Sequence, residues 1–345
     1  MSDSLVRDVA GKLFADLVPP KLVNDAEAGE FPAALWQAVE EAGFPDALAA
    51  AETPGSLDGM ADAAAILREA ASHAAPLPLA ETMIARWLLA GAGIKPPEGP
   101  LTIAPVERAG SLLLHRAGKG WRLAGRAARL PWGQEAAAIV AIVEGRVALL
   151  VAKAGDFRPG RSLAGEPRDD LSVDAEVVAK PAAAGVDAAL VYRLGALARA
   201  VMMAGALDEV LTLTVQYAND RVQFGRPIGK FQAIQQQIAL LAENVAAAGV
   251  VASAAAAAAA GKGDVAFAVA VAKARVGEAA GKAAEIAHQV HGAIGFTHEH
   301  RLHHLTRRLW SWRDEFGVES EWQQELGRIA AARGADGLWP LLTAG

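Results

Sequence analysis

The sequence predicts a mixed α and β protein that is mainly helical, with an N-terminal helical domain (residues 1–97), a small middle β-domain (98–182) and a C-terminal helical bundle (183–345). Three observations predict this fold class. Apolar residues recur every three or four positions in the first and last parts of the chain. Short β-branched and leucine-rich runs separated by turn signals occupy the middle part. An alanine-rich stretch, typical of a helix, lies in the last part.

The N-terminal part is expected to form several helices. Two groups of apolar residues have helical spacing: Val6, Val9, Leu13 and Leu17, then Phe31, Leu35 and Val39. Pro19-Pro20 and Pro45 separate these helices, because proline interrupts a helix interior. A further helix opens at Leu77–Thr82 and runs through Leu88, and Gly91–Gly99 forms a turn-rich boundary.

The period of the apolar pattern changes in the middle part. The expected strands are Ser111–His115, Gly120–Leu123, Ala138–Val143 and Val147–Val151. The segment Glu144–Arg146 is the expected turn between the last two of these strands.

The last part returns to helical spacing. Leu207, Val210, Leu211, Thr214 and Val215 would cover one buried face of a helix. Gly225, Pro227 and Gly229 then require a turn before the pattern resumes at Ile234, Ile238 and Leu241. Ala252–Ala260 belongs to a long helix that ends at Gly261–Asp264, and its small side chains would allow close packing in a bundle.

Composition excludes several classes of protein. A formal charge of −6 with no basic run gives no electrostatic reason to expect nucleic-acid binding. The absence of cysteine excludes disulfides and thiolate metal sites. The N-terminus has no signal-peptide pattern, and the uncharged run Asn244–Gly261 is expected to be too weakly apolar to cross a bilayer. We therefore expect a cytoplasmic protein with no membrane partner.

Arg221 is expected at the close of a helix, just before a glycine-containing bend. A guanidinium there can bind a phosphate through bidentate bonds, and the N–H groups that open the next helix can bind an anion. The alternative interpretation is that Arg221 only caps the helix C-terminus and that Gly225 is an ordinary turn residue.

The segment Arg221–Ile228 (RVQFGRPI), followed by Phe231-Gln232, resembles the RxQFGxPI…FQ signature of acyl-CoA dehydrogenases. Downstream, Gln289–Phe296 (QVHGAIGF) resembles the QxxGGxG motif of the same family, in the expected order and at a fitting separation. Two matched motifs are far more specific than one glycine-rich triplet. The close matches cover Leu207–Gln237 and Gln289–Phe296, and the resemblance elsewhere is one of layout.

The resemblance implies a C-terminal four-helix bundle that binds FAD noncovalently. It assigns Arg221 and the turn Gln223, Phe224 and Gly225 to the pyrophosphate and adenosine half of FAD, with Phe231 and Gln232 in the same cofactor segment. It also implies that the segment Gln289–Gly295, including Gly292, Ala293 and Gly295, reaches the FAD of a neighbouring subunit. Ala293 replaces the family's second motif glycine, and its added methyl could shift the cofactor.

The chemistry that the resemblance implies needs a carboxylate base to remove the α proton of an acyl-CoA thioester. Counting from Gln289, the usual glutamate position falls on Phe316, and Glu315 precedes it. The family's other base position falls on Gly195. Glu315 is the candidate base if Gly317 permits a shifted backbone turn; the alternative is a solvated helix charge.

Three further features of the sequence bear on the site. Thr102–Pro105 is a possible remnant of the family's flavin-contacting loop in the β-domain. Trp132 either stacks on the isoalloxazine or is a buried core residue. His298, His300, His303 and His304 invite a metal site, but the mixed charges around them favour a solvated helix start, so no metal is expected.

Two functions from different classes remain open. The first is an acyl-CoA dehydrogenase that passes electrons to an electron-transferring flavoprotein and assembles as a homodimer or homotetramer. The second is a non-catalytic, FAD-holding subunit of a heteromer, in which a homologous subunit supplies the base. Some bacterial sterol side-chain enzymes of the family are mixed assemblies of the second kind. A helical interaction protein that has lost flavin is a third possibility, against which Arg221 and Gln289 count.

Overall fold

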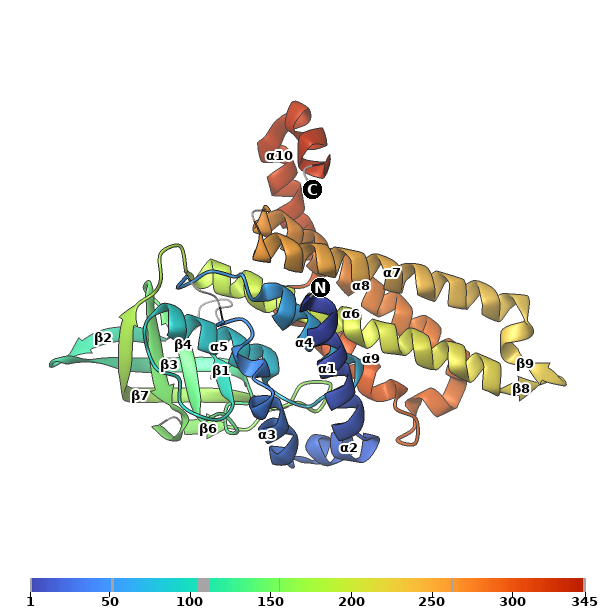
Figure 1. Cartoon of the computed structure of the whole chain (residues 1–345), viewed down its shortest axis with the longest axis horizontal. Helices are drawn as coiled ribbons and strands as arrows, with labels where there is room; N and C mark the ends of the chain where they lie inside the picture. Colours follow the sequence, from blue (N-terminus) through green and yellow to red (C-terminus); the bar gives the residue numbers. More distant parts are fainter. Residues whose placement is uncertain (1, 51–52, 105–111, 155, 262, 344–345) are drawn as a thin grey trace. The chain divides into compact units, whose positions relative to one another are not determined.

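The structure, a computed structural model, describes residues 2–50, 53–104, 112–154, 156–261 and 263–343. These residues form ten α-helices and a seven-stranded sheet, which confirms the predicted mainly helical fold class (Figure 1). The chain divides into two compact units. The first contains Met1–Ile66 and Pro76–Gly195, and the second contains Leu67–Ala75 and Ala196–Gly345. The three predicted domain boundaries stay a prediction.

Helices open the first unit, as the apolar spacing predicted. They are α1 (Ser2–Leu17), α2 (Pro20–Ala28), α3 (Ala33–Glu41), the first part of α4 (Met60–Ser72) and α5 (Leu79–Gly91). Phe14, Leu35 and Val39 are buried, whereas Val9 and Leu17 of the predicted apolar pattern face solvent. Helix α4 was not singled out from the sequence.

The sheet of the first unit follows α5. Its strands are β1 (Leu101–Ile103), β2 (Leu113–Ala117), β3 (Gly120–Pro131), β4 (Ala138–Val143), β5 (Arg146–Val151), β6 (Asp156–Arg158) and β7 (Arg168–Pro181). The strand order is β1-β4-β5-β7-β3-β2, with β6 also paired to β7. The β1–β4 pair is parallel and the other pairs are antiparallel. The Thr82 hydroxyl of α5 donates to the Leu101 carbonyl at 2.9 Å and accepts from its N–H at 3.0 Å, which fixes α5 against β1.

Two strands have the predicted bounds to within one residue. The turn between β4 and β5 has φ 49° at Glu144 and 71° at Gly145, the geometry of a two-residue hairpin turn. Of the predicted strand Ser111–His115, Ser111 lies outside the described residues, as does Pro105 of the predicted loop remnant.

The second unit is a helical bundle. It contains most of α6 (Ala188–Asp220), then α7 (Gln232–Ala260), α8 (Val265–His291), α9 (Leu302–Asp314) and α10 (Glu319–Thr343). Helices α7 and α8 form an antiparallel pair (Figure 1) with rows of buried alanines, including Ala252 and Ala283. The Asp264 side chain caps α8 by accepting from Phe267 N at 3.1 Å. Lys262 of the predicted helix break lies outside the described residues.

Helices α6 and α7 are long and apolar enough to cross a membrane by length and composition alone. The expectation that Asn244–Gly261 is too weakly apolar therefore does not hold for α7 as a whole. Core helices pass the same test, and 83% of the most apolar window of α6 is buried. In α7 only 39% of that window is buried, so much of its apolar surface faces outward.

Candidate cofactor and base sites

The first motif forms a corner between two long helices. Helix α6 ends at Asp220, and Arg221 continues its hydrogen bonding by donating from its N–H to the Tyr217 carbonyl at 2.9 Å. The Arg221 carbonyl accepts from Ile228 N at 2.8 Å, which closes the loop between them. The Arg221 side chain is exposed, and within the described part of the chain its guanidinium has no ion-pair partner. It is therefore available to a ligand.

A two-residue hairpin carries the centre of this motif. Strands β8 (Val222–Gln223) and β9 (Arg226–Pro227) pair around Phe224 and Gly225, whose φ angles are 52° and 79°. Positive φ at both central residues is a type I′ turn, which favours asparagine or glycine and strains a bulky residue. The Phe224 side chain is nevertheless 91% exposed. A strained backbone that presents an aromatic ring to solvent indicates a contact surface.

Phe231 supports this turn. The Phe224 ring lies edge-on to the Phe231 ring at 6.0 Å between centroids, and the Arg226 guanidinium lies 4.2 Å from the Phe231 centroid. Phe231 precedes α7, and Gln232 is the first residue of that helix and is exposed. The predicted cofactor residues from Arg221 to Gln232 therefore share one corner.

The second motif lies where α8 ends. Gln289 is exposed on the last turn of α8, and Gly292 leaves the helix with φ 64°. The short helix η4 (Gly292–Phe296) follows and contains Ala293, which is exposed. Gly295 is buried, and an added Cβ would lie 3.1 Å from His288, His291 and Leu302. A side chain at this position would fit only if these three neighbours shifted by a few tenths of an ångström.

Aromatic stacking joins the two motifs. Tyr217, one turn before Arg221, stacks on His291 at 4.5 Å between ring centroids and an interplanar angle of 21°. His291 Nδ1 lies 2.7 Å from the Ala287 carbonyl, so Nδ1 carries the proton in the neutral ring. Because Gly292 follows His291, this stack places the second motif beside the first. Tyr217 was missed from the sequence, since one tyrosine on a helix carries no motif signal.

Buried histidines support the η4 segment. His288 stacks on Phe296 at 4.0 Å, and its Nε2 lies 2.9 Å from the Thr306 hydroxyl. Burial lowers the pKa of His288, His291 and His300, and neighbouring histidines lower each of these pKa values further. These rings are therefore neutral and packed near pH 7.

Glu315 occupies a different part of the unit. Helix α9 separates the second motif from Glu315 by about 20 Å, at roughly 1.5 Å per residue. Glu315 Oε2 accepts from Arg199 Nε at 2.7 Å, and the two side chains are 11% and 2% exposed, respectively. The alternative interpretation of Glu315 as a solvated charge is therefore wrong, because the carboxylate lies in a buried ion pair.

The turn after α9 is held by a buried lysine. Phe316 has φ 54° and Gly317 has φ 90°, so the backbone makes the unusual turn that Gly317 was predicted to permit. Lys273 Nζ donates to the carbonyls of Arg313 at 2.7 Å and Gly317 at 2.8 Å. Phe316 is buried, with its ring centroid 5.7 Å from the Arg199 guanidinium. The two positions after Asp314 thus hold a paired carboxylate and a core phenylalanine.

Arg199 and Lys273 were also missed from the sequence. Arg199 is a single cation within an apolar helical stretch, and its isolation was the available signal. Lys273 has Arg275 two positions later, so the sequence around it gave no such signal. Gly195, the other predicted base position, lies on α6 one turn before Arg199 and carries no side chain.

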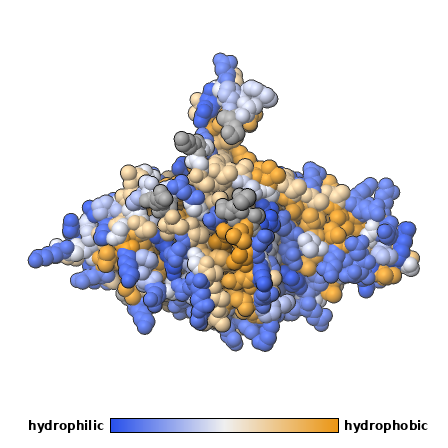
Figure 2. Space-filling model, in the orientation of Figure 1, coloured by the Kyte–Doolittle hydropathy of each residue, from blue (hydrophilic) through white to orange (hydrophobic). Residues whose placement is uncertain are grey.

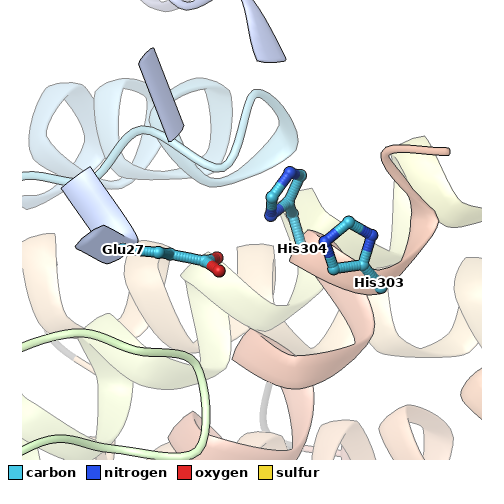
Figure 3. Close-up of side chains that lie close together, drawn as sticks. All are labelled: Glu27, His303 and His304. Atoms are coloured by element: carbon cyan, nitrogen blue, oxygen red, sulfur yellow. The ribbon is translucent and has the colours of Figure 1, made fainter. Parts of the chain in front are cut away.

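The remaining predicted residues have structural roles. The Thr102 hydroxyl is buried and donates to the Pro131 carbonyl at 2.6 Å. Trp132 is buried and lies edge-on to Phe31 at 6.1 Å, so the core interpretation is correct. His303 and His304 lie side by side at the start of α9, with ring centroids 3.9 Å apart (Figure 3). Both are buried, which corrects the expectation of a solvated helix start at these two positions.

Comparisons with known proteins agree with the two motifs. Residues 192–313 match the family model described as acyl-CoA dehydrogenase, C-terminal domain. The chain is 31% identical over 316 residues to acyl-CoA dehydrogenase IpdE2 of Mycobacterium tuberculosis, covering 88% of this chain and 89% of that protein.

Solved structures show the same fold. A chain of the ChsE4–ChsE5 complex from Mycobacterium tuberculosis superposes with a TM-score of 0.81 at 22% identity, covering 95% of this chain and 97% of that one. Butyryl-CoA dehydrogenase from Megasphaera elsdenii superposes with a TM-score of 0.80 at 14% identity, covering 95% and 98%. The two motifs adjoin on this fold, and IpdE2 matches the chain along most of both sequences. The protein therefore belongs to the acyl-CoA dehydrogenase family.

Proposed function

We propose that this chain is an FAD-dependent acyl-CoA dehydrogenase that forms an α,β double bond in an acyl-CoA thioester. The observation that supports this proposal most directly is the junction of the two motifs, where Tyr217 stacks on His291. Bound FAD would supply the hydride acceptor for the β carbon, while a carboxylate removes the α proton.

The residues at this junction fit a flavin dinucleotide. The exposed Arg221 guanidinium would bind the pyrophosphate, and the Gln223–Gly225 turn, Phe231 and Gln232 would contact the adenosine half. Gln289, Gly292 and Ala293 are exposed, and they adjoin the buried Gly295, where an added Cβ would crowd its neighbours at 3.1 Å. The role of each residue toward FAD is part of the proposal.

Glu315 is the proposed base if the chain is catalytic by itself. Its Oε1 lies 3.5 Å from the Ser311 hydroxyl, and its Oε2 is bound by Arg199. Arg199 would act as a positioning residue, and the Lys273-bound turn would keep the carboxylate in place.

The second function, a non-catalytic FAD-holding subunit, is favoured by the same ion pair. A carboxylate that is held by a buried arginine stabilises the fold and is poorly placed to accept a substrate proton. In this assembly, a homologous subunit would supply the base. The ChsE4–ChsE5 structure is by its title a complex of two such chains, which makes a heteromer a concrete alternative to a homodimer or homotetramer.

The remaining parts of the proposal follow from the family. Electrons would pass to an electron-transferring flavoprotein, and the substrate would be a fatty-acyl or sterol side-chain thioester of coenzyme A. We propose a cytoplasmic location and no nucleic-acid partner, in keeping with the charge of −6.

An anaerobic titration tests this function. The purified chain is examined by visible absorbance, and a panel of acyl-CoA thioesters is then added without oxygen. Flavin absorbance that bleaches supports the dehydrogenase, and loss of bleaching in Glu315→Gln supports this base. Flavin that never bleaches supports the non-catalytic subunit, provided that co-expression with a homologous chain restores bleaching. A colourless protein that takes up no added FAD, alone or with a homologue, contradicts both functions.

A further inference from the structure

The second motif continues into a loop whose two ends are histidines. This motif loop runs from His291, the last residue of α8, to His300, just before α9. Of the residues between these two histidines, only Gly295 is buried, so the bundle core holds little of the loop. Thr297 donates to the Ile294 carbonyl from its N–H at 3.0 Å and from its hydroxyl at 2.8 Å. These local bonds shape the loop but do not attach it to another helix.

Both ends of the motif loop pack against one ring of α6. Tyr217 stacks on His291, and it also lies edge-on to His300, with ring centroids 6.2 Å apart and an interplanar angle of 87°. The rings of His291 and His300 contact each other at 4.7 Å and 67°. Aromatic pairs with these separations and angles stabilise a structure beyond the area that they bury. The three rings therefore close the loop on Tyr217.

Two other contacts hold the motif loop less directly. His288 stacks on Phe296 at 4.0 Å, but His288 belongs to α8, the helix from which the loop begins. Arg301, directly after the loop, pairs with Glu209 of α6 at 3.2 Å. The Arg301 side chain is 39% exposed, and exposed ion pairs add little stability. Tyr217 is therefore the contact that fixes both ends of the loop to α6.

We propose that Tyr217 is a positioning residue, which holds the motif loop in its cofactor-binding form before FAD binds. This inference rests on the proposed function, and it concerns how the site is formed rather than which residues touch FAD. Tyr217 lies one turn before Arg221, so it fixes the loop relative to the residue proposed to bind the pyrophosphate. A loop that is already ordered loses less conformational entropy when a ligand binds, and its order therefore raises the affinity.

The ring of Tyr217, rather than its hydroxyl, makes these contacts. The side chain is half-buried, and its hydroxyl makes no hydrogen bond to the described part of the chain. Tyr217→Phe keeps the ring and removes the hydroxyl. Tyr217→Leu removes the aromatic contacts but keeps an apolar side chain that suits a helix. Together the two variants separate the effect of ring stacking from any effect of the hydroxyl.

Hydrogen exchange in the full chain without flavin tests the order of the loop. The amides of Gly292 and Thr297 are hydrogen-bonded to carbonyls at His288 and Ile294. Tyr217→Leu should speed their exchange by about twofold to tenfold, the range expected for the loss of an aromatic pair. Tyr217→Phe should leave their exchange at the wild-type rate. Unchanged exchange of both amides in Tyr217→Leu would overturn the proposal.

The control removes an exposed apolar side chain elsewhere in the second unit. Apolar residues reach the surface along the stretch that Figure 1 labels α7 (Figure 2), and Val250 of this helix is 69% exposed. Val250→Ala should leave exchange in the motif loop unchanged. His300→Ala removes the ring at the other end of the loop and should speed exchange as Tyr217→Leu does. A rate in His300→Ala equal to that of the control would contradict the three-ring contact.

Titration of the apoprotein with FAD, followed by flavin fluorescence, tests the effect on binding. Tyr217→Leu should weaken FAD binding by about twofold to tenfold, whereas Tyr217→Phe and Val250→Ala should bind FAD as the wild type does. An equal loss in Tyr217→Phe would assign the effect to the hydroxyl and contradict positioning by the ring.

The two measurements separate failure of this inference from failure of the proposed function. Wild-type affinity in Tyr217→Leu, together with weak binding in Arg221→Ala, would overturn the role of Tyr217 and leave the proposed function intact. A wild-type chain that takes up no FAD, alone or with a homologue, would contradict the proposed function and the effect of Tyr217 on affinity. Hydrogen exchange would still decide whether Tyr217 orders the loop.

Discussion

Arg221 and Glu315 show two opposite surroundings for a charged side chain. Arg221 is exposed at the end of α6, where a hairpin presents it to solvent. Glu315 is buried against Arg199 with a 2.7 Å hydrogen bond. A charge that faces solvent contributes little to folding and is available for binding, whereas a buried pair makes each partner dependent on the other.

Substitution Arg221→Ala should weaken FAD binding. Loss of a charge-assisted hydrogen bond costs roughly 1.5–3 kcal/mol, which corresponds to a factor of about 10 to 100 in affinity. Titration of the apoprotein with FAD, followed by flavin fluorescence, measures this change. Lys230→Ala removes a nearby exposed charge from the helix η3 (Ile228–Lys230) and should have much less effect. Equal affinities in the two variants would exclude Arg221 as a phosphate ligand.

Substitution Glu315→Gln should destabilise the fold as well as affect the chemistry. A neutral amide leaves the buried Arg199 guanidinium without its carboxylate, and breaking such a pair costs about 3–5 kcal/mol. Urea unfolding measures the loss, and the double variant Arg199→Met/Glu315→Gln should recover part of it. If the losses of unfolding free energy in the two single variants simply added in the double variant, the pair would not couple α6 to the end of α9.

Two turns carry most of the strain among the elements of the second unit. The β8–β9 hairpin holds Phe224 at φ 52°, and the turn after α9 holds Phe316 at φ 54°. The Phe224 ring is exposed, so the strained hairpin places an aromatic ring on a contact surface. The Phe316 ring is buried, so the turn after α9 places its ring in the core.

Substitution Phe224→Asn should stabilise the free chain while weakening cofactor binding. Asparagine adopts positive φ more readily than phenylalanine, so the type I′ turn should gain roughly 1 kcal/mol. The midpoint of thermal unfolding should therefore rise in the absence of FAD. Gly225→Ala, which strains the same turn at φ 79°, should lower that midpoint. A lower midpoint in Phe224→Asn would show that the exposed ring stabilises the hairpin through Phe231.

Substitution Lys273→Met should loosen the turn between α9 and α10. The lysine is buried and donates to carbonyls at Arg313 and Gly317, which would be left unsatisfied at a cost on the order of 3 kcal/mol. Hydrogen exchange should show faster opening of residues 313–320. Lys282→Met changes an exposed lysine on the same helix and should leave this exchange unchanged.

The second unit as a whole separates its two candidate sites. Arg199 and Arg221 lie about 33 Å apart along α6, at roughly 1.5 Å per residue. The motif residues therefore lie at the C-terminal end of α6, whereas Glu315 contacts the first half of that helix through Arg199. We expect the two sites to serve different cofactors in an assembly. In the proposed oligomer, a complete site would therefore combine the motif residues of one chain with the carboxylate of another.

Acidification should destabilise this unit through its buried histidines. Their pKa values are lowered in the folded state, so the unfolded chain binds more protons once the pH falls below about 6.5. Each histidine then removes up to about 1.4 kcal/mol of stability per pH unit until its folded pKa is passed. Burial raises the pKa of Glu209, which acts in the opposite direction at lower pH.

Urea midpoints between pH 7.5 and 5.5 measure this dependence. His288→Phe keeps a ring against Phe296 and Trp310 but removes one titrating group, so its slope should be smaller. A wild-type midpoint that does not change over this range would contradict neutral, buried histidines.

Local sequence patterns were sufficient to predict some secondary-structure elements and not others. Strands β4 and β5 were predicted because their apolar runs flank a glycine turn. Strand β7 was missed although Leu171, Val173 and Ala175 alternate with the polar residues Ser172 and Asp174. The Arg199–Glu315 pair could not be predicted, since its partners are 116 positions apart and no periodicity links them. The two motifs indicated the family, while the stacking that joins them required three-dimensional structure.

Trp339, which is 73% exposed near the end of α10, also makes the chain its own optical reporter. Of the eight tryptophans, Trp36, Trp87, Trp132, Trp312 and Trp322 are buried, whereas Trp339 is surrounded by solvent. A dissolved quencher such as acrylamide should therefore reach Trp339 first and remove a red-shifted component of the emission. Concentrating the protein should shield that component if the ring becomes covered, so that assembly is read as a colour change without any label.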